Sequence, residues 1–206
     1  MIPVKTGARI FGTANPKFRD FCAILALAIG LLVHAPASAA GRWRAPGFAG
    51  TMTKAEWEKI FDPGELEFAG SHLIGFALGW DRPIGDSRYS IGFEAQAVAH
   101  FGRQDHLEFN LPLVLRYTPP QPRRFRFKSV AFGIGPSHAT KIPQVEIDRK
   151  GESQRDLIYW MAEVEFTRPQ PDQSLYVRLH HRSDGFGYYD VNSGSTGLVL
   201  GWRKAF

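Results

Sequence analysis

The chain has 206 residues, of which 44% are hydrophobic and 22% are charged, and its formal net charge is +5. This length allows one domain with a processed segment. A single cysteine excludes an internal disulfide framework, and no nucleic-acid-binding motif accompanies the modest positive charge, so we expect no nucleic-acid partner.

Residues 1–39 are predicted to be a signal peptide. Basic residues precede an apolar run at 21–33, and Ala37, Ser38 and Ala39 supply small residues for cleavage near Ala39. The run is shorter than the about 20 residues that a membrane-spanning helix needs, although an N-terminal anchor helix is an alternative. Cleavage would remove Cys22 and lower the formal net charge from +5 to +2, because the segment carries four basic residues and one acid.

After the signal peptide, residues 40–65 are predicted to be an N-terminal periplasmic segment with a short helix near 51–61. From residue 66 the hydrophobic pattern has period two, which is typical of strands. Eight strands are expected, at residues 66–80, 89–101, 106–117, 124–135, 138–147, 157–167, 175–183 and 196–206.

The lengths of these strands favour a membrane barrel. Strands that cross a bilayer need about 9–11 residues, whereas soluble strands usually have about five or six. We therefore predict an all-β fold, an eight-stranded antiparallel up-and-down transmembrane β-barrel over 66–206. A secreted, lipocalin-like barrel for lipid binding alternates in the same way and stays open as an alternative.

The connections between the predicted strands alternate in length. The longer ones are 81–88, 118–123, 148–154 and 184–195, and the shorter ones are 102–105, 136–137 and 169–173. Outer-membrane barrels have long extracellular loops, short periplasmic turns and periplasmic termini, so the alternation predicts that the longer connections are extracellular. The terminal Phe206 resembles the signal that outer-membrane assembly machinery recognises.

Chemistry is predicted at the end of strand 175–183. His181 and Ser183 extend the apolar stripe on one face, close enough for the imidazole to accept the hydroxyl proton. Alternatively, the strand simply leaves the membrane at His181. His180 points the other way, and with Arg178 and Arg182 we expect it to pair with Glu163 and Glu165 inside the barrel. No pair of histidines has metal-ligand spacing, so no metal and no cofactor are expected.

The run from Leu179 to Ser183, the loop after it and the strand ending at Phe206 resemble the outer-membrane lipid A 3-O-deacylases. Residues 66–206 also match the eight-stranded plan of that family. The resemblance implies that His181 is the general base and Ser183 the nucleophile in hydrolysis of the 3-linked acyl ester of lipid A.

The chain departs from this family at three positions. The family has Asn after the Ser, Gly two positions further on and Glu twelve positions after the Ser; here these are Asp184, Phe186 and Ser195. An ionised Asp cannot donate a hydrogen bond to an oxyanion. Gly185 and Gly187 are therefore the candidate oxyanion donors, and Asp190 is the candidate acid that orients His181.

Arginine and lysine clusters near the longer connections fit an anionic partner. They comprise Arg82 with Arg88, then Arg123, Arg124 and Arg126, and finally Arg149 with Lys150 and Arg155. Arg123, Arg124 and Arg126 are predicted to bind lipid A phosphates. The sequence thus predicts an outer-membrane lipid A deacylase that acts on lipopolysaccharide. The alternative is a catalytically silent structural or lipopolysaccharide-binding barrel, and a homodimer stays open.

Overall fold

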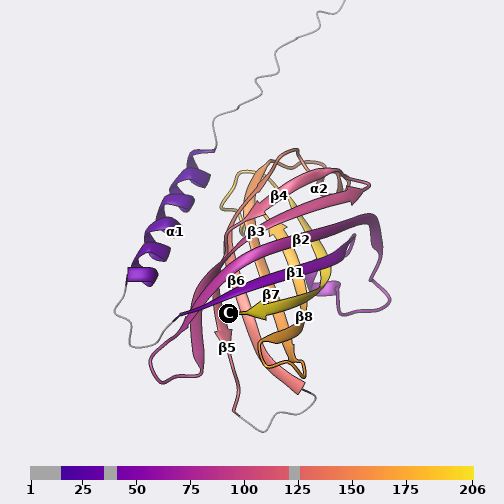
Figure 1. Cartoon of the computed structure of the whole chain (residues 1–206). Coiled ribbons are helices and arrows are strands. Elements are labelled where there is room, and N and C mark those ends of the chain that lie inside the picture. The colour runs from indigo at the N-terminus through magenta and orange to yellow at the C-terminus, as the bar shows by residue number, and fades with distance from the viewer. Residues whose placement is uncertain (1–14, 35–40, 121–125) are drawn as a thin grey trace, which may run out of the picture.

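The computed structural model describes residues 15–34, 41–120 and 126–206, and its strands form one closed antiparallel barrel. Apart from β4 and β5, consecutive strands pair with one another, and β1 (Arg42–Thr53) pairs with β9 (Gly194–Ala205) to close the ring (Figure 1). The strands between them are β2 (Phe68–Pro83), β3 (Tyr89–Gly102), β4 (His106–Asn110), β5 (Leu113–Tyr117), β6 (Phe127–Ala139), β7 (Asp156–Thr167) and β8 (Gln173–Ser183).

The short strands β4 and β5 make up one wall of the barrel, because both pair with β3 on one side and with β6 on the other. They are separated at Leu111 and Pro112, where proline has no N–H to donate to the ladder. The Leu111 N–H still donates to the Pro136 carbonyl at 3.1 Å, and the Pro112 carbonyl accepts from the Glu94 N–H at 3.1 Å. The barrel therefore has eight walls, which confirms the predicted eight-stranded antiparallel β-barrel.

The barrel is polar inside and apolar outside. Alternate residues of a strand point to opposite faces. The outward face carries exposed side chains, including Phe76, Leu115, Phe132, Leu175 and Leu200. The inward face carries buried charged side chains, including Glu94, Arg116, Glu163, Arg178 and Arg203. A soluble barrel that carries lipid needs the reverse arrangement, so the polarity disfavours the lipocalin-like alternative.

Glu163 on β7 is the centre of the interior ion-pair network. Its carboxylate lies 3.1 Å from Arg116 Nη2, 2.7 Å from Arg178 Nη2 and 2.8 Å from Arg203 Nη1. Glu165 lies 2.6 Å from Arg116 Nη1 and accepts further bonds from Lys128, Ser129 and Ser174. These contacts join side chains from β5, β6, β7, β8 and β9, so the network links more than half of the ring.

The structure corrects the sequence analysis in the order of the strands. The first wall is β1, which lies in residues 40–65, where we predicted a periplasmic segment with a short helix instead of a strand. Within that segment only a 3-10 turn, Trp57–Lys59, follows the strand. The strand predicted at 138–147 was wrong, because β6 ends at Ala139 and helix α2 (Gln144–Lys150) follows. One strand was missed and one was wrongly predicted, so the predicted number of strands still equals the observed number of walls.

Because β1 precedes the first predicted strand, the connections in the first half of the barrel lie at the opposite end from the predicted one. The barrel has a terminal end, where β1 begins and β9 ends, and an opposite loop end. The loop end carries the connections 54–67, 103–105, 140–155 and 184–193, with α2 in the third of them. The connection 84–88 lies at the terminal end, where β5 also ends and β6 begins, so the predicted alternation of loop lengths was wrong in its first half.

Helix α1 (Pro16–His34) precedes the barrel, and its first turn contacts the loop end. Phe18 packs against His138 with ring centroids 6.4 Å apart, and Lys17 forms an ion pair with Asp190 at 3.0 Å. No helix in the described parts of the chain is long and apolar enough to span a membrane. These contacts belong to the segment for which cleavage is predicted.

Removal of the central carboxylate should destabilise the barrel. Glu163→Leu removes one carboxylate partner from each of three buried guanidinium groups, at a cost of about 3–5 kcal/mol. Glu67→Leu is the matched control, because within the described residues Glu67 pairs only with Lys54 and both side chains are more than half exposed. The control should change the free energy of unfolding by about 1 kcal/mol or less. Urea titration of the refolded variants in lipid vesicles measures both, and equal losses in the two would contradict the central role of Glu163.

Candidate active site

His181 lies on the outward face of β8, near the loop end. It pairs in register with Thr196 of β9, and its Nδ1 lies 2.9 Å from Thr196 Oγ1. The Trp160 ring lies beside it, with ring centroids 4.5 Å apart. Although it points away from the barrel axis, His181 is only 4% exposed.

The connection 54–67 accounts for this burial, because it folds over the outer wall at β7 and β8. Ile60 forms a buried cluster with Trp160 and Leu179, and Leu66 packs against that cluster. Trp57 meets Trp160 edge to face, with centroids 5.6 Å apart and rings at 86°. A stretch of outer wall that would otherwise face lipid or water is thus covered by the protein itself.

Ser183 is the last residue of β8 and shares the outward face with His181. Its Oγ accepts a hydrogen bond from the Gly185 N–H at 3.2 Å. Within the described residues no hydrogen bond joins Ser183 to His181. Catalytic hydrogen bonds in ligand-free enzymes often form only when substrate binds, so the lack of this bond does not by itself exclude the pair.

The turn after Ser183 is built from left-handed residues. Gly185, Phe186 and Gly187 have φ values of 72°, 59° and 82°, and such a φ is uncommon for a residue as bulky as Phe186. The Gly187 N–H donates to the Asp184 carboxylate at 3.3 Å, and the Gly185 N–H donates to Ser183. Of the two predicted oxyanion donors, Gly185 is therefore the one held next to the Ser183 oxygen.

The structure does not bring Asp190, the predicted orienting acid, to His181. The Asp190 carboxylate is 89% exposed and pairs with Lys17 of α1. The hydrogen-bond partner of His181 is the hydroxyl of Thr196 instead. Ser195, at the position of the family glutamate, faces the interior, where its Oγ donates to Glu146 of α2 at 2.9 Å.

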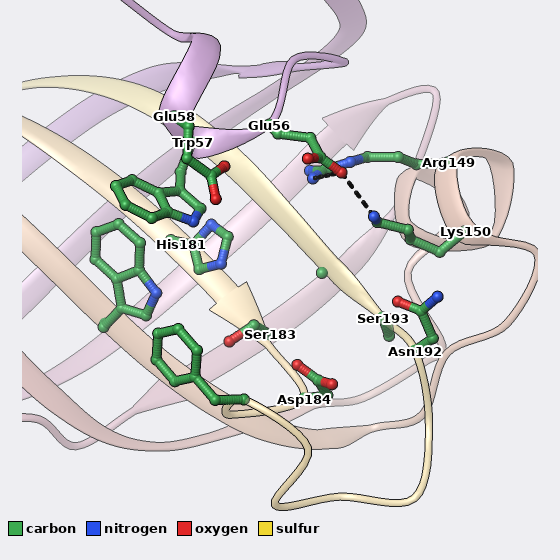
Figure 2. Close-up of a pocket in the computed structure, with 13 residues that line it drawn as sticks. Glu56, Trp57, Glu58, Arg149, Lys150, His181, Ser183, Asp184, Asn192 and Ser193 are labelled. Atoms are coloured by element: carbon green, nitrogen blue, oxygen red, sulfur yellow. Dashed lines mark hydrogen bonds and ion pairs between the residues drawn. The ribbon is translucent and has the colours of Figure 1, made fainter.

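His181 and Ser183 line a pocket of about 220 Å³ at the loop end (Figure 2). Trp57, Trp160 and Phe186 supply its apolar lining. Its polar rim comes from the connection 54–67, from α2 and from the connection 184–193, and consists of Glu56, Glu58, Arg149, Lys150, Asp184, Asn192 and Ser193.

The cationic part of the rim is Arg149 and Lys150 at the end of α2. Lys150 Nζ lies 2.7 Å and Arg149 Nη2 lies 3.7 Å from the Glu56 carboxylate (Figure 2). The hydrogen bond from Lys150 lowers the pKa of the Glu56 carboxyl below its usual value. Buried Glu146 anchors α2 through Ser153, Ser193 and Ser195 and through an ion pair with Arg182 at 3.4 Å.

Arg126, one of the predicted phosphate-binding residues, does not line this pocket. Arg126 begins the chain leading into β6 at the terminal end, where its carbonyl accepts a bond from Thr167 at 3.2 Å. Arg123 and Arg124 lie outside the described residues. Arg149 and Lys150 were among the cationic clusters found in the sequence, whereas Trp57, Trp160 and Thr196 were not singled out, since nothing in their local sequence relates them to His181.

Comparison with known proteins identifies a similar solved structure. No family model matches the chain, and a search of curated proteins finds no match. A solved structure titled "Crystal structure of the outer membrane enzyme PagL" is similar with a TM-score of 0.54 and 13% sequence identity. The similarity covers 78% of this chain and 98% of that one. At this identity it shows the fold.

Substitutions in the connection 54–67 test whether this connection covers His181. Ile60→Ala should weaken the packing of the connection 54–67 by about 2 kcal/mol, since Ile60 is buried against Trp160 and Leu179. That change raises the fraction of molecules in which the connection 54–67 has detached from the outer wall roughly 30-fold. Modification of His181 by diethyl pyrocarbonate, followed by mass spectrometry, should accelerate accordingly. Phe61→Ala is the control, because Phe61 is 79% exposed and should leave the rate unchanged. The same rate in all three proteins would show that the connection does not cover His181.

Proposed function

We propose that the protein is an outer-membrane esterase that hydrolyses the 3-linked acyl ester of lipid A in lipopolysaccharide. The observation that carries this proposal is the position of His181 and Ser183. Both face outward at the end of a barrel strand, in a pocket that adjoins an apolar outer wall. An enzyme acting on a lipid of the outer leaflet needs its nucleophile in this place.

The polarity of the barrel supports insertion into a membrane. Exposed apolar side chains surround the outer face, and the eight-stranded fold is similar to that of the outer membrane enzyme PagL. Export would use the signal peptide at residues 1–39, and its cleavage would release Asp190 from Lys17. The terminal end then faces the periplasm and the loop end faces outward, with the pocket at the level of the lipid headgroups.

Thr196 prepares His181 to act as a base. When the imidazole Nδ1–H donates to Thr196 Oγ1, the lone pair of Nε2 is left to accept a proton. Substrate binding turns the Ser183 hydroxyl from Gly185 toward His181. The Ser183 oxygen then attacks the ester carbonyl carbon as its proton passes to His181 Nε2.

The remaining steps use the same groups. Once Ser183 has rotated, the Gly185 N–H no longer binds Oγ and donates to the developing oxyanion. The protonated His181 gives its proton to the departing sugar oxygen, and an acyl group stays on Ser183. Water, deprotonated by His181, then attacks this acyl ester, and the bond to Ser183 breaks as His181 returns the proton to Ser183 Oγ and the fatty acid leaves. Gly187 remains engaged with Asp184, so we assign it to the shape of the turn.

Two surfaces fit the two parts of the substrate. Lys150 and Arg149 would bind a lipid A phosphate, which displaces Glu56 as their anionic partner. A shallow apolar groove of about 380 Å³ lies on the outer wall of β1, β8 and β9, lined in part by Phe68, Val177 and Leu200. This groove offers a place for an acyl chain next to the outward-facing apolar residues of β8 that precede His181.

A catalytically silent barrel that binds lipopolysaccharide is the second candidate. It is favoured by the absence of a hydrogen bond between His181 and Ser183 and of a carboxylate on His181 within the described residues. The cationic rim and the apolar groove serve binding equally well. The two functions differ only in whether the acyl ester is cut.

Substitution of the pair separates the two candidates. Ser183→Ala and His181→Ala should each reduce release of the 3-linked acyl chain by at least about 10³-fold while the barrel still assembles. Thr196→Val should reduce it about fivefold, because one hydrogen bond worth about 1 kcal/mol is lost. Ser87→Ala, at the terminal end, is the control. Mass spectrometry of lipid A incubated with the refolded proteins measures release. Acylation that is the same with wild type, with Ser183→Ala and without protein would reject the esterase and leave the silent barrel.

A further inference from the structure

Three potential metal ligands meet inside the barrel near the loop end. His100 comes from β3, Glu108 from β4 and His180 from β8, and each is at most 5% exposed. The two carboxylate oxygens of Glu108 lie 3.0 Å from His100 Nε2 and 2.9 Å from His180 Nε2. The potential ligand atoms of the three side chains all lie within 4.8 Å of one another.

Glu108 differs from the other buried carboxylates in its partners. Within the described residues Glu94, Glu146, Glu163 and Glu165 each form an ion pair with at least one arginine, whereas the ion pairs of Glu108 are with histidines alone. Asn110 adds only a neutral hydrogen bond to Glu108, at 2.7 Å. A buried carboxylate is costly unless a positive charge lies beside it. A cation held with the two imidazoles would supply that charge.

Two imidazole nitrogens at this place are buried and lack partners. His180 Nδ1 and His106 Nε2 have no hydrogen bond within the described residues. His106 stacks on His100, with centroids 4.3 Å apart and rings at 10°. Buried polar atoms without partners are uncommon in folded proteins and call for water, an ion or a functional role. Neither nitrogen is hydrogen-bonded to Glu108, so an ion beside this carboxylate would leave both to a water molecule.

We propose that His100 Nε2, His180 Nε2 and one oxygen of Glu108 bind a single divalent transition-metal ion of the zinc class. Two imidazoles and one carboxylate are a donor set that zinc accepts, with bonds of about 2.0–2.2 Å. A tetrahedral ion would draw the donor atoms to about 3.4 Å from one another, which requires small rotations of the three side chains.

Gln104 is the residue that must adjust. Its Nε2 now lies 3.0 Å from His100 Nδ1, and its Oε1 accepts from the Val145 N–H at 3.3 Å. A metal on Nε2 places the imidazole proton on Nδ1, so Gln104 must turn its amide and accept that proton with Oε1. Metal ligands of this type usually donate their second N–H to such a partner. The adjustment gives up only the long bond to Val145.

The bound ion would cross-link opposite walls of the barrel. His180 stands on β8, across the ring from β3 and β4, and its neighbour in the chain is His181. The cross-link would therefore fix the end of β8 that carries the pocket. This inference concerns binding of the ion and is independent of the esterase proposal.

The test is metal binding by the refolded full-length chain. Protein stripped with a chelator should take up one zinc ion per chain, measured by mass spectrometry of the metal, and one cobalt ion with an absorption spectrum of imidazole coordination. Glu108→Gln and His180→Ala should each weaken zinc binding by at least about 100-fold. His106→Phe keeps the stacked ring outside the donor set and should bind zinc as wild type does.

Two results would overturn the proposal. One is wild-type barrel that folds, as its gel mobility shows, but binds neither ion. The three side chains would then form a hydrogen-bonded network only. The other is zinc binding that survives in folded Glu108→Gln, which would place the ion elsewhere. The wild-type measurement decides the matter even where a variant fails to fold.

Discussion

The charge network around Glu163 is the constraint on which the rest of the structure depends. Three arginines from β5, β8 and β9 converge on one carboxylate, and such a cluster is tolerated only where every member is paired and shielded. Tyr176 lies between two of them, with its ring 4.8 Å from Arg178 and 4.5 Å from Arg203. A Cβ at Gly201 would lie 2.1 Å from that ring, so glycine is needed there. Because the charges fill the inside, the large apolar side chains of the same strands must face outward.

This outward placement of the apolar side chains determines the surroundings of the candidate site. Outward positions on β8 carry apolar residues from Leu175 to Leu179, and the next outward positions are His181 and Ser183. The connection 54–67 covers them on one side, and α2, anchored by Glu146, brings Arg149 and Lys150 to the other. The result is a small polar site on the outer wall of a barrel, beside an apolar surface. That combination suits an amphipathic substrate whose ester lies at the boundary between acyl chains and headgroups.

The sequence predicted seven of the eight walls and the outward pair, because both follow from strict alternation within single strands. It missed β1, whose residues 45–50 are mostly small and include a proline, so no apolar alternation marks them. They are small for a physical reason: a Cβ at Gly50 would lie 2.3 Å from the Leu198 carbonyl oxygen of β9.

Thr196 and the cluster of His100, Glu108 and His180 could not be predicted, because only barrel closure and register bring these strands together. His180 accordingly pairs with Glu108 rather than with the predicted Glu163 and Glu165.

The central claim is that an outward-facing serine on a membrane barrel acts as a nucleophile. Its most direct test is covalent labelling of the folded, membrane-inserted protein with a long-chain fluorophosphonate, followed by peptide mass spectrometry. The account predicts a phosphonyl group on Ser183 in the wild type and its loss when His181 is replaced by alanine, since an unassisted serine hydroxyl is a weak nucleophile. A folded barrel in which Ser183 stays unlabelled, or in which another residue carries the label, would contradict it.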